Sequence, residues 1–583
     1  MDEIDQRRSN AGLGASGESE PESKGLYDLP KQLIGAYAGV RELQPSTWNT
    51  STSSKKGETE TERIIEPSVE EDDSPGSLSF RILLLAAGIF LLSALPRLYV
   101  LFFMTDLNNP GVGWYNDVFH HWQIGYLSKE IGFSNGFLRL WDLKGMEFFW
   151  GLLDPLMLTV LFGVTGSTDI VILRLLGLVS GGVAVTAFFF LIKRYFTTQV
   201  ALATALLVAT NPVAVFADSS GMQGPMATSI TMIGLLLWPR RPLWAGVALA
   251  IAGMARAEYW VFGAGLVFLS FFSDESGDRK IAVALGWLVP SLAYMRYMTS
   301  YTGNPIYPVY WNFMGNSVGT WTGEVPIVSV PLSNAETAAR WIWRLALIPI
   351  SLLAYSILRK RRPSFLFLMY GVGNIMFLSL YWSFTRAVYG WGERGIYDRI
   401  FIVPHMYLAL IISLLLMGIL QRKETNRLRR AIGWAGIAIL TVSSQMAYRP
   451  IMRFYEEGAW ELEAEEVVAE AVASVYEGGS IAMPEDRPSL TYLLAHDFGI
   501  SAQHFTSQMY DPFAYIDGGD AFANWTANRE SMAEWFRKLD IRLIVYYSGK
   551  QHYTEMIRRE PNWFNYVGTY YGGQILVYEV RGF

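Results

Sequence analysis

Apolar runs about as long as a lipid bilayer is thick recur along the chain between residues 80 and 448. A helix needs about 20 mostly apolar residues to cross about 30 Å of hydrocarbon, and clear runs lie at 80–104, 281–295, 401–420 and 431–447. Charged residues make up only 17% of the chain, against about 25% in soluble domains. The sequence therefore predicts an α-helical polytopic membrane protein, so that the lipid bilayer is one of its partners.

The apolar runs predict about 11 transmembrane helices. The expected spans are 80–104, 170–192, 200–217, 225–238, 242–255, 259–272, 281–299, 342–358, 364–383, 400–420 and 431–448. The segment 148–165 is also apolar, but Asp154-Pro155 interrupts it. We expect that segment to lie along the membrane surface as an interfacial helix.

Basic residues predict the orientation of these helices. Short loops on one side are rich in Lys and Arg, as in 193–194, 240–241, 279–280, 359–362 and 422–430, whereas the loops on the other side carry fewer. Because cytoplasmic loops carry the excess of positive charge, we expect the N-terminus in the cytoplasm and the C-terminus outside. The prediction is a multi-pass protein of the cell membrane.

Three regions follow from this layout. Residues 1–78 are polar and predict a disordered cytoplasmic tail. Residues 79–448 form the membrane domain, with a first outer loop at 105–169 that holds juxtamembrane helices. Residues 449–583 return to soluble character, with strands expected at 480–483, 541–547 and 574–580 and helices at 460–476 and 531–539, which predicts a small extracytoplasmic α/β domain.

Two counts exclude whole classes of function. The chain has no Cys, so disulfides, thiol catalysis and thiolate metal sites are impossible. The net charge is −6, which argues against a nucleic-acid partner.

Asp117 is the strongest candidate for a general base. It lies just outside the first predicted span, next to Asn116 and close to His120 and His121. Asp117 and His121 are four residues apart and share a face if the segment is helical. These groups could also bind a divalent metal such as Mg or Mn, although adjacent His side chains point apart on a helix. The alternative role for Asp117 is to cap a helix that begins with Val118.

Charged residues near the outer surface form a second set of candidates, because such residues are costly close to lipid. Arg256 and Glu258 lie at an outer turn and either face a phosphate or form an internal ion pair. Arg394 and Arg399 either clamp a phosphate or snorkel to the interface. Asp154 and Glu147 could line the same cavity or be solvated carboxylates, and Asp218 is either functional or a helix-end carboxylate in water.

The order of several short motifs resembles the GT-C superfamily of membrane glycosyltransferases, in particular the branch of the protein O-mannosyltransferases and the lipid A aminoarabinose transferase. The motifs are Leu95-Pro-Arg97, Asn116-Asp117, Leu152-Leu-Asp-Pro-Leu156, Asp218 to Pro225 with Gln223, Ala255-Arg-Ala-Glu258, Gly303-Asn-Pro-Ile-Tyr307, and Glu393 to Pro404.

The resemblance implies an inverting transfer of a sugar from a polyprenyl-phosphate donor, dolichyl- or undecaprenyl-linked, to a protein, a lipid-linked glycan or a surface polymer. It also implies Asp117 as the base and Asn116, His121, Asp154, Asp218, Gln223, Arg256, Glu258, Arg394 and Arg399 as substrate-binding residues. The family usually has Glu after the base, whereas Val118 stands here.

Three other readings compete with this one. An oligosaccharyltransferase acting on Asn is expected to carry a Trp-Trp-Asp-Tyr-Gly motif, which does not occur in the sequence. A transporter or lipid flippase predicts paired repeats and charges at mid-membrane. A catalytically inactive scaffold is the third alternative, because Val118 replaces the family's Glu.

Overall fold

The structure is a computed structural model. It describes residues 80–104, 116–132, 151–310, 334–360, 363–389, 402–418, 427–447, 464–484, 487–508, 525–547 and 551–582. The predicted tail at 1–78 therefore lies outside the described residues.

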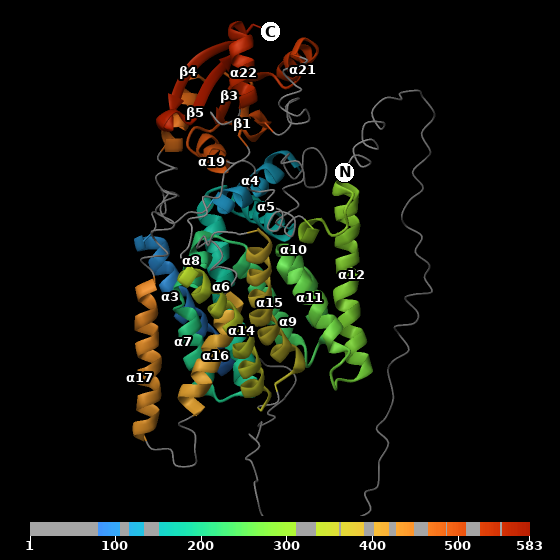
Figure 1. Cartoon of the computed structure of the whole chain (residues 1–583), viewed down its shortest axis with the longest axis vertical. Coiled ribbons are helices and arrows are strands. Elements are labelled where there is room, and N and C mark those ends of the chain that lie inside the picture. Colours follow the sequence, from blue (N-terminus) through green and yellow to red (C-terminus); the bar gives the residue numbers. More distant parts are fainter. Residues whose placement is uncertain are drawn as a thin grey trace, which may run out of the picture. The chain divides into compact units, whose positions relative to one another are not determined.

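The described residues between 80 and 447 are mostly helical (Figure 1). The segment 105–169, predicted as the first outer loop, contributes α4 (Asn116–Leu127), η2 (Ser128–Gly132) and α5 (Leu153–Thr165). The other helices are α3 (Phe80–Tyr99) with η1 (Val100–Met104), α6 (Ile170–Tyr195), α7 (Thr198–Ala209), α8 (Pro212–Ser220), α9 (Gly224–Leu237), α10 (Pro242–Ala255), α11 (Ala257–Ser270), α12 (Gly277–Thr302), α14 (Asn334–Arg359), α15 (Phe365–Tyr389), α16 (Ile402–Gly418) and α17 (Arg427–Ser444).

The chain is a polytopic membrane protein. Within the described residues, α3 with η1, α6 and α12 each have the length and apolar composition of a span, and α7 with α8 makes a fourth if the bent pair counts as one. Every predicted span coincides with a helix or with that pair. The predicted fourth to sixth spans correspond to α9, α10 and α11, which have 14 residues each and so reach only about 21 Å.

The predicted span 200–217 is in fact broken, because the chain turns by 58° between α7 and α8. Pro212 opens α8 and cannot donate a backbone hydrogen bond to the preceding turn. The side chain of Asn211 instead accepts a hydrogen bond from the backbone N–H of Ala214 at 3.0 Å. The break re-aims the chain so that α8 leads into the Gly221–Pro225 turn.

The segment 148–165 contains a helix, α5, that begins only at Leu153 and has 13 residues. Its start lies against the end of α10, because Gly151 has a φ of +97° and a Cβ there would lie 2.3 Å from the carbonyl oxygen of Met254. Only glycine allows this approach. Helices α4 and α5 lie side by side (Figure 1). They pack closely, since a Cβ on Gly125 would lie 2.8 Å from the Cβ of Leu158.

The C-terminal region forms a five-stranded mixed sheet in the order β2-β1-β3-β5-β4 (Figure 1). β1 (Ser480–Met483) is parallel to β2 (Phe505–Ser507) and β3 (Ile541–Tyr547), whereas β5 (Ile575–Val580) is antiparallel to β3 and β4 (Phe564–Tyr570). The helices of this region are 464–475, α19 (Pro488–His496), α21 (Trp525–Lys538) and α22 (Gln551–Arg559). The predicted α/β character of this region is confirmed.

Two strands, β2 and β4, and two helices, α19 and α22, of this region were not predicted. β2 has only three residues, too few for a pattern. β4 shifts its register between Tyr566 and Gly568, which breaks the alternation that marks a strand. α19 begins with Pro488 and is buried over most of its length, so its sequence lacks an amphipathic period.

Candidate active site

A buried polar network joins the first outer loop to the membrane domain. Gln223 Nε2 lies 2.9 Å from His121 Nδ1 and donates to Asp154 Oδ2 at 3.3 Å. His121 Nδ1 and Asp154 Oδ2 are 4.0 Å apart. Each of the three side chains is at most 2% exposed. The sequence analysis predicted these three residues as separate candidates, and the structure brings their side chains together.

Each member of the network comes from a different element. His121 is in the second turn of α4, Asp154 is in the first turn of α5, and Gln223 is the residue before α9. Burying such polar groups is unfavourable unless they satisfy one another. The network therefore fixes the two outer-loop helices against the start of α9.

Burial raises the pKa of the Asp154 carboxyl from 3.8 to about 7, while the hydrogen bond from Gln223 and the positive charge of Arg256 act in the opposite direction. A carboxyl with a pKa near neutral pH exchanges its proton under physiological conditions. Such groups gather at functional sites.

Asp218 forms a buried ion pair with Arg97. The guanidinium Nε donates to Asp218 Oδ2 at 2.7 Å, and Nη2 lies 2.6 Å from the same oxygen. Arg97 Nη1 also donates to the carbonyls of Ser93 and Ala209 at 2.7 and 3.1 Å. These contacts tie α3 to α7 and α8, so Asp218 has a structural partner rather than a free carboxylate.

Two glycines of α6 make room for this pair. A Cβ on Gly181 would lie 1.9 Å from Asp218 Oδ2 and 2.8 Å from Arg97 Nε, and one on Gly177 would lie 2.4 Å from the carbonyl oxygen of Asp218. Glycine four residues apart on one helix face lets another backbone approach closely. The spacing of these residues explains why α8 can lie against α6.

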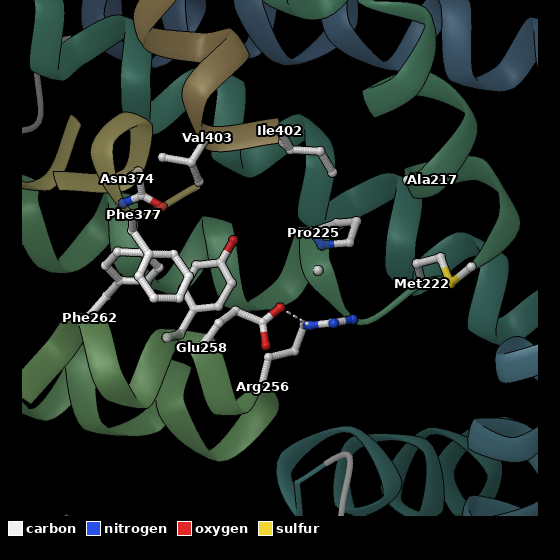
Figure 2. Close-up of a pocket in the computed structure, with 12 residues that line it drawn as sticks. Ala217, Met222, Pro225, Arg256, Glu258, Phe262, Asn374, Phe377, Ile402 and Val403 are labelled. Atoms are coloured by element: carbon white, nitrogen blue, oxygen red, sulfur yellow. Dashed lines mark hydrogen bonds and ion pairs between the residues drawn. The ribbon is translucent and has the colours of Figure 1, made fainter. Parts of the chain in front are cut away.

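Figure 2 shows a pocket in the membrane domain. Its cavity volume, apart from the open mouth, is about 30 Å³. Its polar lining groups are Arg256, Glu258, Tyr259 and Asn374. The rest of the lining is apolar or glycine: Ala217, Met222, Gly224, Pro225, Phe262, Phe377, Ile402 and Val403.

Arg256 and Glu258 lie on one side of this pocket, with the hydrogen bond between them drawn in Figure 2. Arg256 Nε donates to Glu258 Oε1 at 2.5 Å, and the side chains are 16% and 25% exposed. Among the described residues, Glu258 is the hydrogen-bond partner of the guanidinium. The internal ion pair expected as one alternative is present, and it still leaves both terminal nitrogens of Arg256 for a ligand.

The pocket and the network share the turn from Gly221 to Pro225. Met222, Gly224 and Pro225 line the pocket, and Gln223 between them turns to His121 and Asp154. Asp218 does not line the pocket, although its neighbour Ala217 does. The predicted substrate-binding set thus divides into pocket residues, network residues and the Asp218 ion pair.

Several predicted site residues lie outside what the structure describes. The backbone of α4 begins at Asn116, which agrees with a helix opening at Asn116-Asp117, but the side chains of these two residues are not among those described. Arg394 and Arg399 are outside the described residues altogether. The described residues contain no group of three or more His, Asp or Glu side chains placed for a metal, and a set that includes Asp117 stays a prediction.

Sequence reasoning missed Asn374 and Tyr259 in the pocket. Asn374 Nδ2 donates to the carbonyl of Tyr370 at 2.8 Å, and the Tyr259 hydroxyl lies 2.5 Å from Thr228 Oγ1. Asn374 had a usable signal, since it is a polar residue inside the apolar helix α15. Tyr259 had none, because tyrosines are common throughout the membrane domain.

Comparison with known proteins finds solved structures of low identity and low TM-score. No family model matches the chain, and no curated protein matches it. Among solved structures, the oligosaccharyltransferase of Archaeoglobus fulgidus in its apo form is similar with 12% identity and a TM-score of 0.45, over 83% of this chain and 74% of that one.

ArnT from Cupriavidus metallidurans bound to undecaprenyl phosphate is similar with 13% identity and a TM-score of 0.46, over 86% of this chain and 98% of that one. The archaeal oligosaccharyltransferase AglB from Archaeoglobus fulgidus, in complex with an inhibitory peptide and a dolichol-phosphate, is similar with 13% identity and a TM-score of 0.45. The similarity covers 85% of this chain and 74% of that one. At these identities and TM-scores, the similarity carries no argument about the activity or the residue roles of this chain.

Proposed function

We propose that this protein is a membrane glycosyltransferase that takes a sugar from a polyprenyl-phosphate carrier and transfers it, with inversion, to an acceptor on the outer side of the membrane. The observation that carries the proposal is the pocket of Figure 2, where an arginine with two available terminal nitrogens faces a largely apolar wall. This combination suits a ligand that has an anionic group and an apolar chain.

The carrier phosphate is assigned to Arg256. A guanidinium presents its nitrogens as a fork that matches two phosphate oxygens. The hydrogen bond from Nε to Glu258 fixes the orientation of that fork. The positive charge stabilises the leaving phosphate as negative charge builds up on it. Arg394 and Arg399 are proposed as further cations for the same group.

The prenyl chain is assigned to the apolar side of the pocket. Met222, Phe262, Phe377, Ile402 and Val403 supply this wall from four different segments of the membrane domain. A polyprenyl tail offers only apolar contacts, so a wall of this kind binds it by burial of apolar surface.

Asp117 is assigned as the base. It lies at the start of α4, one helical turn before His121 and therefore about 6 Å along the helix from the buried network. In the proposed step, the Asp117 carboxylate takes the proton of an acceptor hydroxyl and the hydroxyl oxygen bonds to the anomeric carbon. The bond from that carbon to the phosphate oxygen breaks, and the phosphate leaves with the electron pair. One displacement inverts the anomeric configuration.

Substitution of Arg256 tests the donor site. Arg256→Gln is expected to weaken binding of undecaprenyl or dolichyl phosphate by about ten-fold or more, because it removes a charged hydrogen-bond partner. Arg256→Lys keeps the charge and is expected to bind with intermediate affinity. The readout is binding of a radiolabelled polyprenyl phosphate to the purified protein in vesicles.

The matched control is Arg241→Gln, which removes an exposed arginine that does not line the pocket. Affinity equal to that of the native protein is expected. Equal affinity in the Arg256→Gln variant would remove the assignment of this pocket to the carrier phosphate.

A further inference from the structure

The C-terminal sheet domain touches the outer-loop helix α4 through a polar contact. Gln123 Nε2, on α4, donates to Thr491 Oγ1, on α19, at 3.0 Å. The two residues are 368 positions apart in the sequence. Gln123 is 1% exposed and Thr491 is fully buried. A buried polar pair of this kind bonds well in one register only, because a shifted register leaves both groups unsatisfied.

Aromatic rings surround this pair. Tyr492 of α19 contacts Phe119 and Trp122 of α4, with ring centroids 5.4 and 4.9 Å apart in edge-on arrangements. Tyr492 also stacks on His496 at 4.9 Å. Such pairs add a preferred geometry to apolar burial.

α19 also reaches the turn before α6. His496 Nε2 lies 3.6 Å from Asp169 Oδ2, and Asp169 caps α6 by accepting from the backbone N–H of Val171 at 2.8 Å. Trp122 Nε1 donates to the carbonyl oxygen of Thr168 in the same turn at 2.6 Å. The C-terminal domain, α4 and the start of α6 therefore meet at one point.

Opposite faces of α4 make the two sets of contacts. At about 3.6 residues per turn, positions 119, 122, 123 and 126 fall on one side of the helix and positions 117, 121 and 124 on the other. The first side meets α19. On the second side, His121 meets Gln223 and Asp154. α4 is held between the C-terminal domain and the membrane domain.

We propose that α19 positions the proposed base, and that Gln123, Thr491 and Tyr492 are positioning residues for sugar transfer. The inference rests on the proposed function of Asp117. A slip of α4 by one residue moves a side chain by about 1.5 Å along the helix and turns it by about 100°. Displacements of about 1 Å in a reacting group reduce rates by about a hundred-fold, so the rate depends on the register that the Gln123–Thr491 bond sets.

The test compares Thr491→Val with Thr491→Ser. Valine keeps the shape of threonine but removes the hydroxyl, whereas serine keeps the hydroxyl. Thr491→Val is expected to lower kcat for sugar transfer about ten-fold, which corresponds to about 1.4 kcal/mol, with the donor KM unchanged. Thr491→Ser is expected to stay within about two-fold of the native kcat.

A merely structural contact would lower the yield or the thermal stability of Thr491→Val and leave the kcat of its folded fraction at the native value. That result would overturn the proposal. So would equal losses of kcat in the valine and serine variants, since the serine variant retains the hydrogen bond.

A second measurement does not depend on catalysis. Hydrogen exchange of the α4 backbone amides is expected to be faster in Thr491→Val than in the native protein and in Thr491→Ser. Unchanged exchange in Thr491→Val would overturn the role of α19. If exchange responds as expected but the native protein transfers no sugar, the proposed function fails while the positioning of α4 by α19 stands.

Discussion

The carboxyl of Asp154 is buried with a hydrogen-bond donor, a histidine and a nearby arginine around it. Its pKa of about 7 has burial as the largest cause, so in the folded protein the neutral form is favoured up to neutral pH. The unfolded chain ionises this group near its ordinary value of 3.8. Folding is therefore linked to proton uptake by Asp154 between these two values.

This linkage predicts a pH dependence of stability. The contribution of Asp154 is fully present below pH 4 and is lost as the pH rises to about 7, a change of about 4 kcal/mol at about 1.4 kcal/mol per pH unit. Asp154→Asn removes the titration. We expect the thermal midpoint of the native protein to fall relative to that of the variant between about pH 4 and 7, and the gap to stay constant above. Parallel profiles in detergent would contradict the raised pKa.

Only some of the residues of the candidate site could be predicted from the sequence. Arg256 and Glu258 were recognisable because charged side chains beside apolar spans are rare, and they do line a pocket. The Arg97–Asp218 pair was not predicted, since its members are 121 residues apart and either residue alone fits several roles. Gln223 was chosen only through a family resemblance, and its bonds to His121 and Asp154 depend on how three helices meet.

Two helices can pack closely where one of them has glycine at the contact, as α6 does against α8. Gly181→Ala would put a methyl group on the Arg97–Asp218 pair. Separating a buried ion pair costs about 3–5 kcal/mol, so we expect a loss of that size in the free energy of unfolding. The measurement is thermal or denaturant unfolding in detergent.

Gly265→Ala provides the matched control for this prediction. Gly265 is also inside a helix, α11, but nothing lies within 4 Å of a Cβ built there. Alanine favours helix by about 1 kcal/mol over glycine, so this variant is expected to equal or exceed native stability. Similar losses in both variants would show that the closeness of α6 and α8 is not the cause.

Periodicity and length predicted most elements, and local chemistry explains the exceptions. The strands 480–483 and 541–547 were predicted to the residue, because each is a short β-branched or apolar run between turns. The span 200–217 was not recognised as two helices, since hydropathy averages over Asn211-Pro212. α19 was missed because its role is to pack between domains, and a helix buried on most sides has no polar face to reveal it.

At the scale of the whole molecule, the excess of basic residues in alternate loops predicts the tail in the cytoplasm and the C-terminal domain outside. A chain without cysteine allows single cysteines to report this orientation. Ser474 is exposed in the C-terminal domain, and Gln199 is exposed near Lys193-Arg194. The two reporter variants are Ser474→Cys and Gln199→Cys.

An impermeant maleimide added to intact cells is expected to label Ser474→Cys and to label Gln199→Cys only after permeabilisation. The reverse pattern would place the pocket and the outer-loop helices on the cytoplasmic side. The recurring apolar runs were enough to predict a polytopic membrane protein. The packing of α19 on α4 depends on contacts between residues such as Gln123 and Thr491, whose separation in sequence leaves no local pattern.

Asp117 is proposed to act as the base in sugar transfer from a polyprenyl-phosphate donor. The most direct test follows radiolabelled sugar from a panel of such donors in vesicles, with native protein, Asp117→Asn and the control Glu130→Gln, which removes another carboxylate of the same outer loop.

We expect transfer by the native protein and by Glu130→Gln. Asp117→Asn is expected to lose at least about a hundred-fold in rate, the usual contribution of a general base, while it still binds the donor. Transfer by Asp117→Asn at the native rate would contradict the role of Asp117, and a native protein that consumes no donor in the panel would contradict the proposed function itself.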